Sequence, residues 1–174
     1  MAIKIGVIGA GSVGFTRRLV RDILTVPELQ DTVFGFTDIS ERNLSMIAQL
    51  VERDIAGNNL PAKVLRSVER RPALEDADYV LNLSRIGGLE AFALDIDIPL
   101  KYGVDINVGD TRGPAGIFRA LRTIPVMLEI CTDIEKYCPD AVFLNYTNPM
   151  AMLCRAMQGK FPKLTISGLC HSVQ

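Results

Sequence analysis

The sequence predicts an α/β fold, a doubly wound parallel sheet with helices on both faces. Apolar, strand-like runs alternate along the chain with segments whose apolar residues recur at helical spacing. In addition, a glycine-rich turn joins the first of these strands to the first helix. Strands linked by crossover helices assemble into a parallel sheet. We expect six strands in the order 3-2-1-4-5-6, the order of Rossmann-like dinucleotide-binding domains.

The glycine-rich turn follows the apolar run at residues 4–8 and opens a helix. Gly9 permits the tight turn, Gly11 allows the backbone to approach a ligand, and Gly14 allows the helix to pack closely on the strand. The free N–H groups at the start of such a helix attract an anion, here the pyrophosphate of a dinucleotide. We therefore predict cofactor contacts from Gly9, Gly11, Ser12, Gly14 and Phe15. The alternative is a glycine turn that holds no ligand.

Asp38, at the end of the next strand, indicates which dinucleotide is bound. A carboxylate at this position accepts hydrogen bonds from the ribose hydroxyls and repels a 2′-phosphate. The sequence therefore predicts NAD rather than NADP.

The composition favours a single cytoplasmic domain, residues 1–174, that acts on a small molecule. The length of 174 residues fits one domain. The net charge of −1 and the lack of a dense basic block argue against nucleic-acid binding. No apolar run reaches the roughly 18 residues of a membrane span, so no membrane contact is expected. The four cysteines form no C-x-x-C pair, and three of them are expected to be core thiols in a reducing compartment.

The individual elements follow from periodicity, caps and turn residues. Ser40 is the predicted N-cap of the second helix. The basic side chains Arg17, Arg18 and Arg21 are expected to face solvent, with one near the helix N-terminus able to reach the cofactor phosphates. Residues 85–116 form a long, glycine-rich connection at the ligand edge, where long connections usually carry function. The helices are predicted at 13–26, 41–57, 72–76, 89–101, 114–137 and 150–157, and the strands at 4–8, 32–39, 63–68, 79–84, 141–146 and 164–170.

Three strand ends are expected to meet in one crevice, because the carboxyl ends of parallel strands share an edge. A thiolate and an imidazole there are good ligands for a divalent transition metal. Neighbouring side chains on a strand point to opposite faces, so Cys170 is the predicted ligand. His171 is then a second ligand or an acid/base group; the alternative is a buried thiol and a core histidine. The three ends carry Ser84 with Arg85, Asn148 beside Pro149, and Cys170 with His171.

Several segments together resemble the amino-terminal part of the family 4 glycoside hydrolases, and most closely their α-galactosidase branch. The resemblance covers essentially all 174 residues. It is carried by GAGSVGF at 9–15, Asp38, ALDIDIPLKYG at 93–103, GDTRGPAGIFRALRTIP at 109–125, NYTNPMA at 145–151 and GLCHSVQ at 168–174.

The resemblance implies a hydrolase that uses NAD and a divalent cation, usually Mn²⁺, instead of a pair of carboxylates. In this family, NAD takes a hydride from sugar C3, a base removes the acidified C2 proton, the glycosidic oxygen leaves, and water addition and hydride return follow. The resemblance also implies residue roles. Cys170 ligates the cation, Asn148 bonds the C2 and C3 hydroxyls, His171 assists departure of the leaving group, and Asp110 is a pocket residue.

A departure from the family pattern restricts the class of substrate that we expect. Members that cleave phosphorylated sugars carry an arginine just before the ALD segment, where this chain has Phe92. An apolar side chain cannot neutralise a phosphate, which favours an unphosphorylated α-galactoside. A galacturonide or glucuronide is the alternative, with Arg85 meeting the uronate carboxylate.

The family's second metal-binding histidine and its basic tyrosine lie beyond the last matching motif, so none of the chain's tyrosines is assigned that role. We expect these 174 residues, which lack the family's carboxy-terminal substrate domain, to bind cofactor with little or no hydrolysis. The full-length protein is expected to be a homo-oligomer. Two other functions stay open: a lactate/malate-type NAD dehydrogenase, which needs no metal, and a catalytically silent NAD-binding module that NAD merely stabilises.

Overall fold

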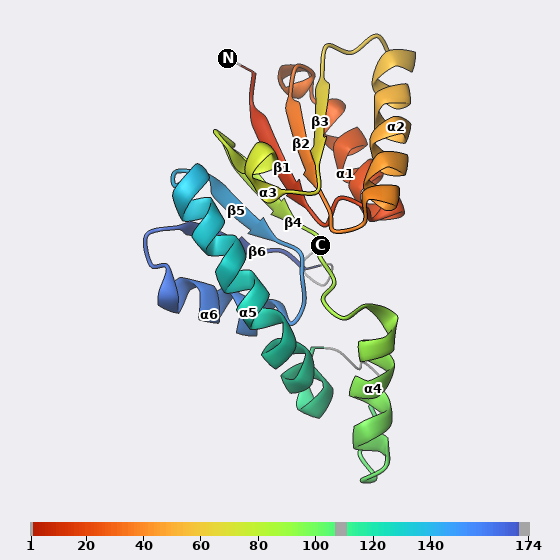
Figure 1. Ribbon diagram of the computed structural model, residues 1–174, viewed down its shortest axis with the longest axis vertical. Coiled ribbons are helices and arrows are strands. Elements are labelled where there is room, and N and C mark those ends of the chain that lie inside the picture. The colour runs from red at the N-terminus through yellow and green to blue at the C-terminus, as the bar shows by residue number, and fades with distance from the viewer. Residues whose placement is uncertain (1, 107–110, 171–174) are drawn as a thin grey trace.

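The structure is a computed structural model and describes residues 2–106 and 111–170. At its centre is a six-stranded sheet in which neighbouring strands run parallel, in the order β3-β2-β1-β4-β5-β6 (Figure 1). The predicted fold class and strand order are therefore confirmed. The strands are β1 (Lys4–Ile8), β2 (Val33–Thr37), β3 (Lys63–Ser67), β4 (Tyr79–Asn82), β5 (Val142–Asn145) and β6 (Thr165–Gly168).

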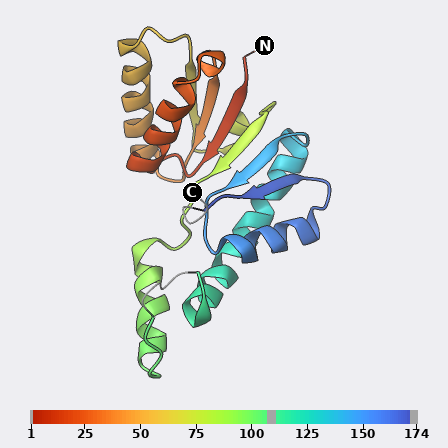
Figure 2. The ribbon, with the colours of Figure 1, turned by 180° about the vertical axis from the view of Figure 1, so that it is seen from behind.

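Helices cover both faces of the sheet. Two opposite views show α1 and α2 on one face and α3 and α5 on the other (Figures 1 and 2). α6 packs against α5 and β6, whereas α4 stands away from the sheet beside the first turns of α5. None of the helices in the described part of the chain is long and apolar enough to span a membrane. The helices are α1 (Val13–Leu24), the 3-10 helix η1 (Pro27–Leu29), α2 (Glu41–Gly57), α3 (Arg70–Leu74), α4 (Gly88–Leu100), α5 (Gly113–Tyr137) and α6 (Met150–Lys160).

Most elements agree with the prediction, and the differences have local causes. Ser40 is the N-cap of α2, where its hydroxyl accepts a hydrogen bond from the backbone N–H of Asn43 at 3.3 Å. α3 begins at Arg70 rather than at Pro72, since a proline fits anywhere in the first turn of a helix. β6 ends at Gly168 rather than at Cys170, because its neighbour β5 ends at Asn145, the register partner of Gly168.

Two apolar cores lie on either side of the sheet. One packs β2 and β1 against α1 and α2, and the other packs β4 and β5 against α5 and α6. On the face opposite α1 and α2, the short helix α3 covers β1, β2 and β3 and lies unusually close to them. A Cβ added at Gly6 would lie 2.9 Å from the Ala73 carbonyl oxygen, and one at Gly35 would lie 2.6 Å from it. These two strand glycines therefore make room for α3.

The strand register places the ends of five strands level with one another at one edge of the sheet. Ile8 pairs with Thr37 on one side and with Asn82 on the other, Asn82 pairs with Asn145, and Asn145 pairs with Gly168. The residues that follow these ends therefore share the carboxyl edge, where ligands bind in sheets of this type.

Candidate functional site

The turn after β1 is fixed by backbone geometry. Gly9 has a φ of +78°, a left-handed conformation that favours glycine. The N–H groups of Gly9 and Ala10 both donate to the Thr37 carbonyl oxygen, at 3.0 and 3.1 Å. A Cβ at Gly9 would lie 2.6 Å from the backbone nitrogen of Ser84. Glycine is thus required at position 9, and the turn rests directly on the end of β4.

Gly11 brings the turn into contact with Asp38. The Gly11 N–H donates to Asp38 Oδ2 at 2.9 Å, and the Ser40 N–H donates to Asp38 Oδ1 at 2.8 Å. A Cβ at Gly11 would lie 2.8 Å from Asp38 Oδ2 and 2.9 Å from Asn43 Cβ. The close approach that requires a glycine here is therefore an approach to Asp38 and α2, whereas the sequence predicted an approach to a ligand. The two hydrogen bonds hold the Asp38 carboxylate in one orientation.

The packing role predicted for Gly14 is wrong. A Cβ at Gly14 would meet no described atom within 4 Å, so this glycine is not squeezed between helix and strand. Gly14 instead lines an open cavity at the start of α1.

The first of two cavities at this edge, which we call the Asp38 cavity, has a volume of about 420 Å³. Asp38 and Ser12 contribute polar groups to it, and Ile39 stands at its wall with its side chain fully exposed. The apolar side chains were not predicted as site residues, since they come from distant segments and share no motif. The cavity is lined by Ile8, Gly9, Ser12, Thr37, Asp38, Ile39, Ser40, Asn43, Val68, Arg70, Leu83, Ser84, Arg85, Ile86, Val126 and Ile130.

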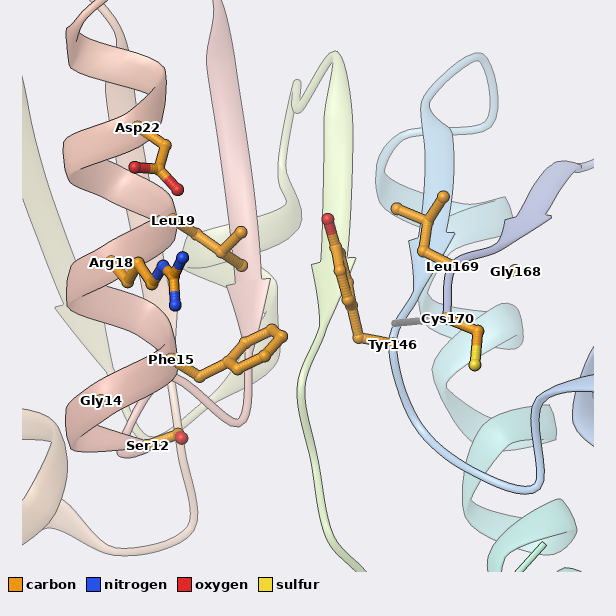
Figure 3. A pocket seen from close by; sticks show the side chains of 10 residues that line it. All are labelled: Ser12, Gly14, Phe15, Arg18, Leu19, Asp22, Tyr146, Gly168, Leu169 and Cys170. Atoms are coloured by element: carbon orange, nitrogen blue, oxygen red, sulfur yellow. The ribbon is translucent and has the colours of Figure 1, made fainter. Parts of the chain in front are cut away.

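The second cavity, which we call the Cys170 cavity, has a volume of about 870 Å³ and lies between α1 and the ends of β5 and β6 (Figure 3). Ser12 lines both cavities, so they adjoin at the N-cap of α1. The Cys170 cavity is lined by Ser12, Gly14, Phe15, Arg18, Leu19, Asp22, Tyr146, Gly168, Leu169 and Cys170.

Two aromatic side chains that line the Cys170 cavity contact each other. The rings of Phe15 and Tyr146 meet edge to face, with centroids 5.3 Å apart. Burial raises the pKa of the Tyr146 hydroxyl. Leu169 and Cys170 point in opposite directions, and the Cys170 sulfur is turned away from the aromatic pair (Figure 3). β6 ends at Gly168, so Cys170 lies two residues beyond the end of the strand.

The basic residues of α1 are all solvent-accessible but make different contacts. Arg17 forms a two-pronged ion pair with Asp54 of α2, with Nε and Nη2 at 2.7 and 2.8 Å from the carboxylate oxygens. Arg18 lines the Cys170 cavity, and Arg21 lies 4.0 Å from Asp54 with its side chain 64% exposed. Arg17, with its side chain 38% exposed, is thus part of a surface ion pair whose partner lies 37 positions away in the sequence, and the pairing was not predicted.

A buried polar network supports the carboxyl edge beneath the two cavities. The Asn82 amide nitrogen donates to Asn145 Oδ1 at 2.9 Å and to Thr147 Oγ1 at 3.1 Å. Asn82 Oδ1 accepts the Ser84 hydroxyl at 2.7 Å, and the Thr147 hydroxyl donates to the Ser84 carbonyl oxygen at 2.8 Å. The network ties the ends of β4 and β5 together, and the half-buried Asn148 follows it directly.

Arg85, which lines the Asp38 cavity, contacts the aromatic ring of Phe92. Its guanidinium carbon lies 4.8 Å from the centre of the Phe92 ring, a cation–π arrangement.

Two predicted site residues, Asp110 and His171, lie outside the described residues. Within the described ranges, no three histidine, cysteine or acidic side chains are placed to hold a metal ion together. Cys170, half-buried at the wall of its cavity, therefore belongs to no set of three such side chains among the described residues.

Two other cysteines are core thiols, as predicted. Cys131 and Cys138 are buried, and burial raises the pKa of Cys131 to about 12 and that of Cys138 to about 11. Cys154 is half-buried, and burial raises its pKa as well.

Comparison with known proteins gives consistent matches. An alpha-galactosidase of Rhizobium meliloti (strain 1021) is 52% identical over 174 residues, which is 99% of this chain and 35% of that protein. An alpha-galacturonidase of Thermoanaerobacter italicus is 40% identical over 98% of this chain and 37% of that protein. The structure of the 6-phospho-beta glucosidase from Thermotoga maritima with manganese, NAD+ and glucose-6-phosphate matches with a TM-score of 0.86 at 32% identity, over 97% of this chain and 40% of that chain.

The chain therefore spans between a third and two fifths of the length of these relatives. A sequence profile described as family 4 glycosyl hydrolase matches residues 4–174. With a match over nearly every residue and a fold shared with solved members at more than 30% identity, this chain belongs to glycosyl hydrolase family 4.

Proposed function

We propose that residues 1–174 form the NAD-binding domain of a family 4 glycoside hydrolase that cleaves unphosphorylated α-galactosides. The observation that carries the proposal is the contact between Gly11 and Asp38, at the wall of the Asp38 cavity. A lactate/malate-type dehydrogenase would use the same fold, but family membership favours the hydrolase. We further propose the cytoplasm as its compartment, where core thiols such as Cys131 stay reduced.

The residues of the Asp38 cavity fit NAD. Asp38 has both oxygens fixed by backbone N–H groups and keeps lone pairs for two ribose hydroxyls. Ser12, at the N-cap of α1, makes no side-chain cap bond, and the first turn of α1 carries no acidic residue. Its N–H groups can therefore receive a pyrophosphate without a competing carboxylate. Exposed Ile39 would lie against the apolar adenine.

The described residues fit a divalent cation only in part. The Cys170 thiolate can ligate a divalent transition ion, although it is a softer ligand than Mn²⁺ prefers, and the described residues bring no three histidine, cysteine or acidic side chains together. We propose Cys170 as one ligand and His171 as a second ligand or as the acid that assists the leaving group. The remaining ligands, and the base that removes the C2 proton, are assigned to parts of the protein other than the described residues.

In the proposed reaction, NAD when bound accepts the C3 hydride and returns it. The chain's own contribution is to position the sugar at the carboxyl edge. Asn148 donates and accepts hydrogen bonds at the C2 and C3 hydroxyls, and the Asn82–Thr147 network beneath it fixes the backbone from which it projects. Asp110 completes the pocket in this proposal.

We propose a substrate without a phosphate on the basis of the pair formed by Arg85 and Phe92. The Phe92 ring offers no charge, and the Arg85 guanidinium already lies over it. A galacturonide is the second candidate, since Arg85 also lines the Asp38 cavity and a guanidinium binds carboxylates well. The similarity to the galacturonidase of Thermoanaerobacter italicus supports including it in the test.

A segment exchange tests this function without relying on the isolated chain, which we expect to bind NAD but not to hydrolyse. The matching segment of the Rhizobium meliloti alpha-galactosidase is replaced by these 174 residues, and nitrophenyl α-galactoside and α-galacturonide are offered with NAD, Mn²⁺ and a thiol reductant. We expect galactoside hydrolysis that needs NAD and Mn²⁺ and that Cys170→Ser and Asn148→Ala each lower at least a hundredfold. The matched control Cys138→Ser, at a core thiol, should retain the activity.

Preferred cleavage of the galacturonide would replace the galactoside with the second candidate. A folded, NAD-binding chimera that hydrolyses neither substrate would overturn the hydrolase proposal. Hydrolysis that survives chelation of divalent cations would remove the proposed role of Cys170.

A further inference from the structure

The Asp38 cavity is lined by an arginine, Arg70, as well as by the aspartate. The two residues follow neighbouring strands, since Thr37 at the end of β2 pairs with Ser67 at the end of β3. The Thr37 hydroxyl also donates to the Val68 carbonyl oxygen at 3.4 Å. Asp38 comes directly after Thr37, and Arg70 begins α3 two residues after Val68. Both charged residues therefore come from the same corner of the carboxyl edge.

The two residues favour different dinucleotides. An aspartate after the second strand accepts hydrogen bonds from the ribose hydroxyls of NAD, whereas an arginine nearby accommodates the 2′-phosphate of NADP. A guanidinium can bind a phosphate through two parallel hydrogen bonds, which are strong because both groups are charged. A cavity lined by both residues selects NAD only if the guanidinium is kept from the ribose.

An ion pair with α5 holds the Arg70 guanidinium. α3 packs against α5 on one face of the sheet (Figure 1), and Arg70 Nε lies 2.5 Å from Asp133 Oδ2. The two residues are 63 positions apart in the sequence. In the described part of the chain, the Arg70 side chain has no other hydrogen-bond or ion-pair partner. Asp133 is thus the single group there that fixes its position.

The ion pair lies on the side of Arg70 away from Asp38. Asp133 is not one of the residues that line the Asp38 cavity. It lines a separate groove of about 360 Å³ between the start of α3 and the last turns of α5. Arg70 is at the wall of both the cavity and the groove, and its Nε is bonded on the groove side.

The ion pair also determines the charge at the ribose end of the cavity. Asp133 neutralises Arg70, and the side chains of the pair are only 26% and 34% exposed, so solvent screens their attraction incompletely. The partners of the Asp38 carboxylate are the uncharged N–H groups of Gly11 and Ser40. The negative charge of Asp38 is therefore left to repel a 2′-phosphate.

We propose that Asp133 is a specificity-determining residue, which holds Arg70 against α5 so that the Asp38 cavity accepts NAD and rejects NADP. Asp133 acts through Arg70 and is thus a positioning residue. The inference rests on the proposed function, because it assumes that the ribose of the dinucleotide lies at Asp38. It assigns part of the cofactor selectivity to a helix residue outside the cavity.

Loss of the Asp133 charge should release Arg70 toward the cavity. Asp133→Asn keeps the size of the side chain but removes the carboxylate that binds the guanidinium. A 2′-phosphate in the cavity then offers Arg70 an anionic partner with matching geometry. NAD carries no phosphate at this position, so its affinity should change little.

Calorimetric titration of the 174-residue chain with NAD and with NADP tests the inference. Asp133→Asn should bind NADP at least tenfold more tightly than the wild type does, and NAD within about threefold of the wild type. Asp133→Glu, which keeps a carboxylate, should retain the wild-type ratio of the two affinities. Asp133→Asn combined with Arg70→Gln should lose the gain, because the guanidinium that would bind the phosphate is gone.

Asp54→Asn is the matched control. It also removes one negative charge and breaks an aspartate–arginine ion pair between two helices, but on the opposite face of the sheet. Its affinities for both dinucleotides should equal those of the wild type. Circular dichroism melting verifies that each variant is folded.

An unchanged NADP affinity in folded Asp133→Asn overturns the inference. A gain that persists in the double variant, or that Asp54→Asn reproduces, overturns it as well, because the gain then does not come from Arg70. A wild-type chain that binds neither dinucleotide overturns the proposed function and this inference together. A wild-type chain that binds NAD, with no gain for NADP in Asp133→Asn, overturns the inference alone.

Discussion

The backbone N–H of Gly11 donates to Asp38 Oδ2 at 2.9 Å, which joins the glycine turn after β1 to the carboxylate after β2. The absence of a Cβ at Gly11 makes this distance possible, since a Cβ would lie 2.8 Å from the same oxygen. The two parts of a dinucleotide site, the turn for the pyrophosphate and the carboxylate for the ribose, are thus positioned by direct contact with each other.

Alanine at positions 11 and 14 should have opposite effects on stability. The Cβ of Gly11→Ala meets Asp38 and Asn43 below 3.0 Å, so we expect a loss of about 1–3 kcal/mol in the free energy of unfolding. The Cβ of Gly14→Ala meets no described atom within 4 Å, and alanine favours the helix by about 0.5–1 kcal/mol. Urea unfolding of the two variants measures both values. Equal destabilisation by the two substitutions would contradict the structure.

The Asn82 network should be essential to stability, in contrast to an isolated buried hydroxyl nearby. Asn82→Leu removes the acceptor of the Ser84 hydroxyl and one donor to the Thr147 hydroxyl, and each group left unsatisfied costs about 1–3 kcal/mol. Thr123 Oγ1 is buried and has no hydrogen-bond partner among the described residues. Thr123→Val should therefore be neutral or stabilising by up to about 1 kcal/mol. Chemical denaturation measures the free energy of unfolding of both variants. A loss for Thr123→Val as large as that for Asn82→Leu would refute this assignment.

The ion pair between α1 and α2 should make stability depend on acidity. Its hydrogen bond with Arg17 lowers the pKa of Asp54 from 3.8, the value for an unperturbed aspartate. A carboxyl with a depressed folded-state pKa stabilises the fold above the unfolded-state pKa, and this stability is lost as the pH falls through the folded-state value. The stability difference between wild type and Asp54→Asn should thus be present at neutral pH, begin to shrink near about pH 4, and be lost as the pH falls further through the lowered folded-state pKa of Asp54.

Arg17→Gln breaks the same pair and should follow the same pH course as Asp54→Asn. A difference between wild type and either variant that stays constant from neutral to acid pH would mean that the ion pair contributes no pH-dependent stability.

The cysteines should react with an alkylating reagent in the order of their accessibility. Cys131 and Cys138, whose pKa values burial raises to about 12 and 11, should stay unmodified in the folded protein at mildly alkaline pH. Cys170, at the wall of an open cavity, should be modified first, and Mn²⁺ should slow its reaction. Peptide mass spectrometry identifies the sites. Alkylation of Cys170 that Mn²⁺ leaves unchanged would count against its role as a ligand.

The parts of the structure that could be predicted are those set by local chemistry. The strand order follows from alternating strands and helices, the turn at Gly9 from a conformation that glycine favours, and the cap at Ser40 from its hydroxyl. The end of β6 was placed two residues late, because a strand ends where its neighbour does, and the sequence of β6 does not contain that information.

The contacts that were missed join residues far apart in the chain. Arg17 meets Asp54 across 37 positions, Phe15 meets Tyr146, and the Asn82 network closes across more than 60 positions. A polar residue inside the apolar run of β4 was the one available signal for the network. The reason for glycine at positions 11 and 14 was likewise invisible, since it depends on what lies beside each Cα in the fold.

The most direct test of the account is a calorimetric titration of the 174-residue chain with NAD and with NADP, repeated on Asp38→Asn. We predict that NAD binds and that NADP binds at least tenfold more weakly. Loss of the charged acceptor should weaken NAD binding roughly ten- to a hundredfold, as hydrogen bonds to charged groups contribute about 1.5–3 kcal/mol. A folded wild-type chain that binds neither dinucleotide, or binds NADP as tightly as NAD, would contradict the central claim.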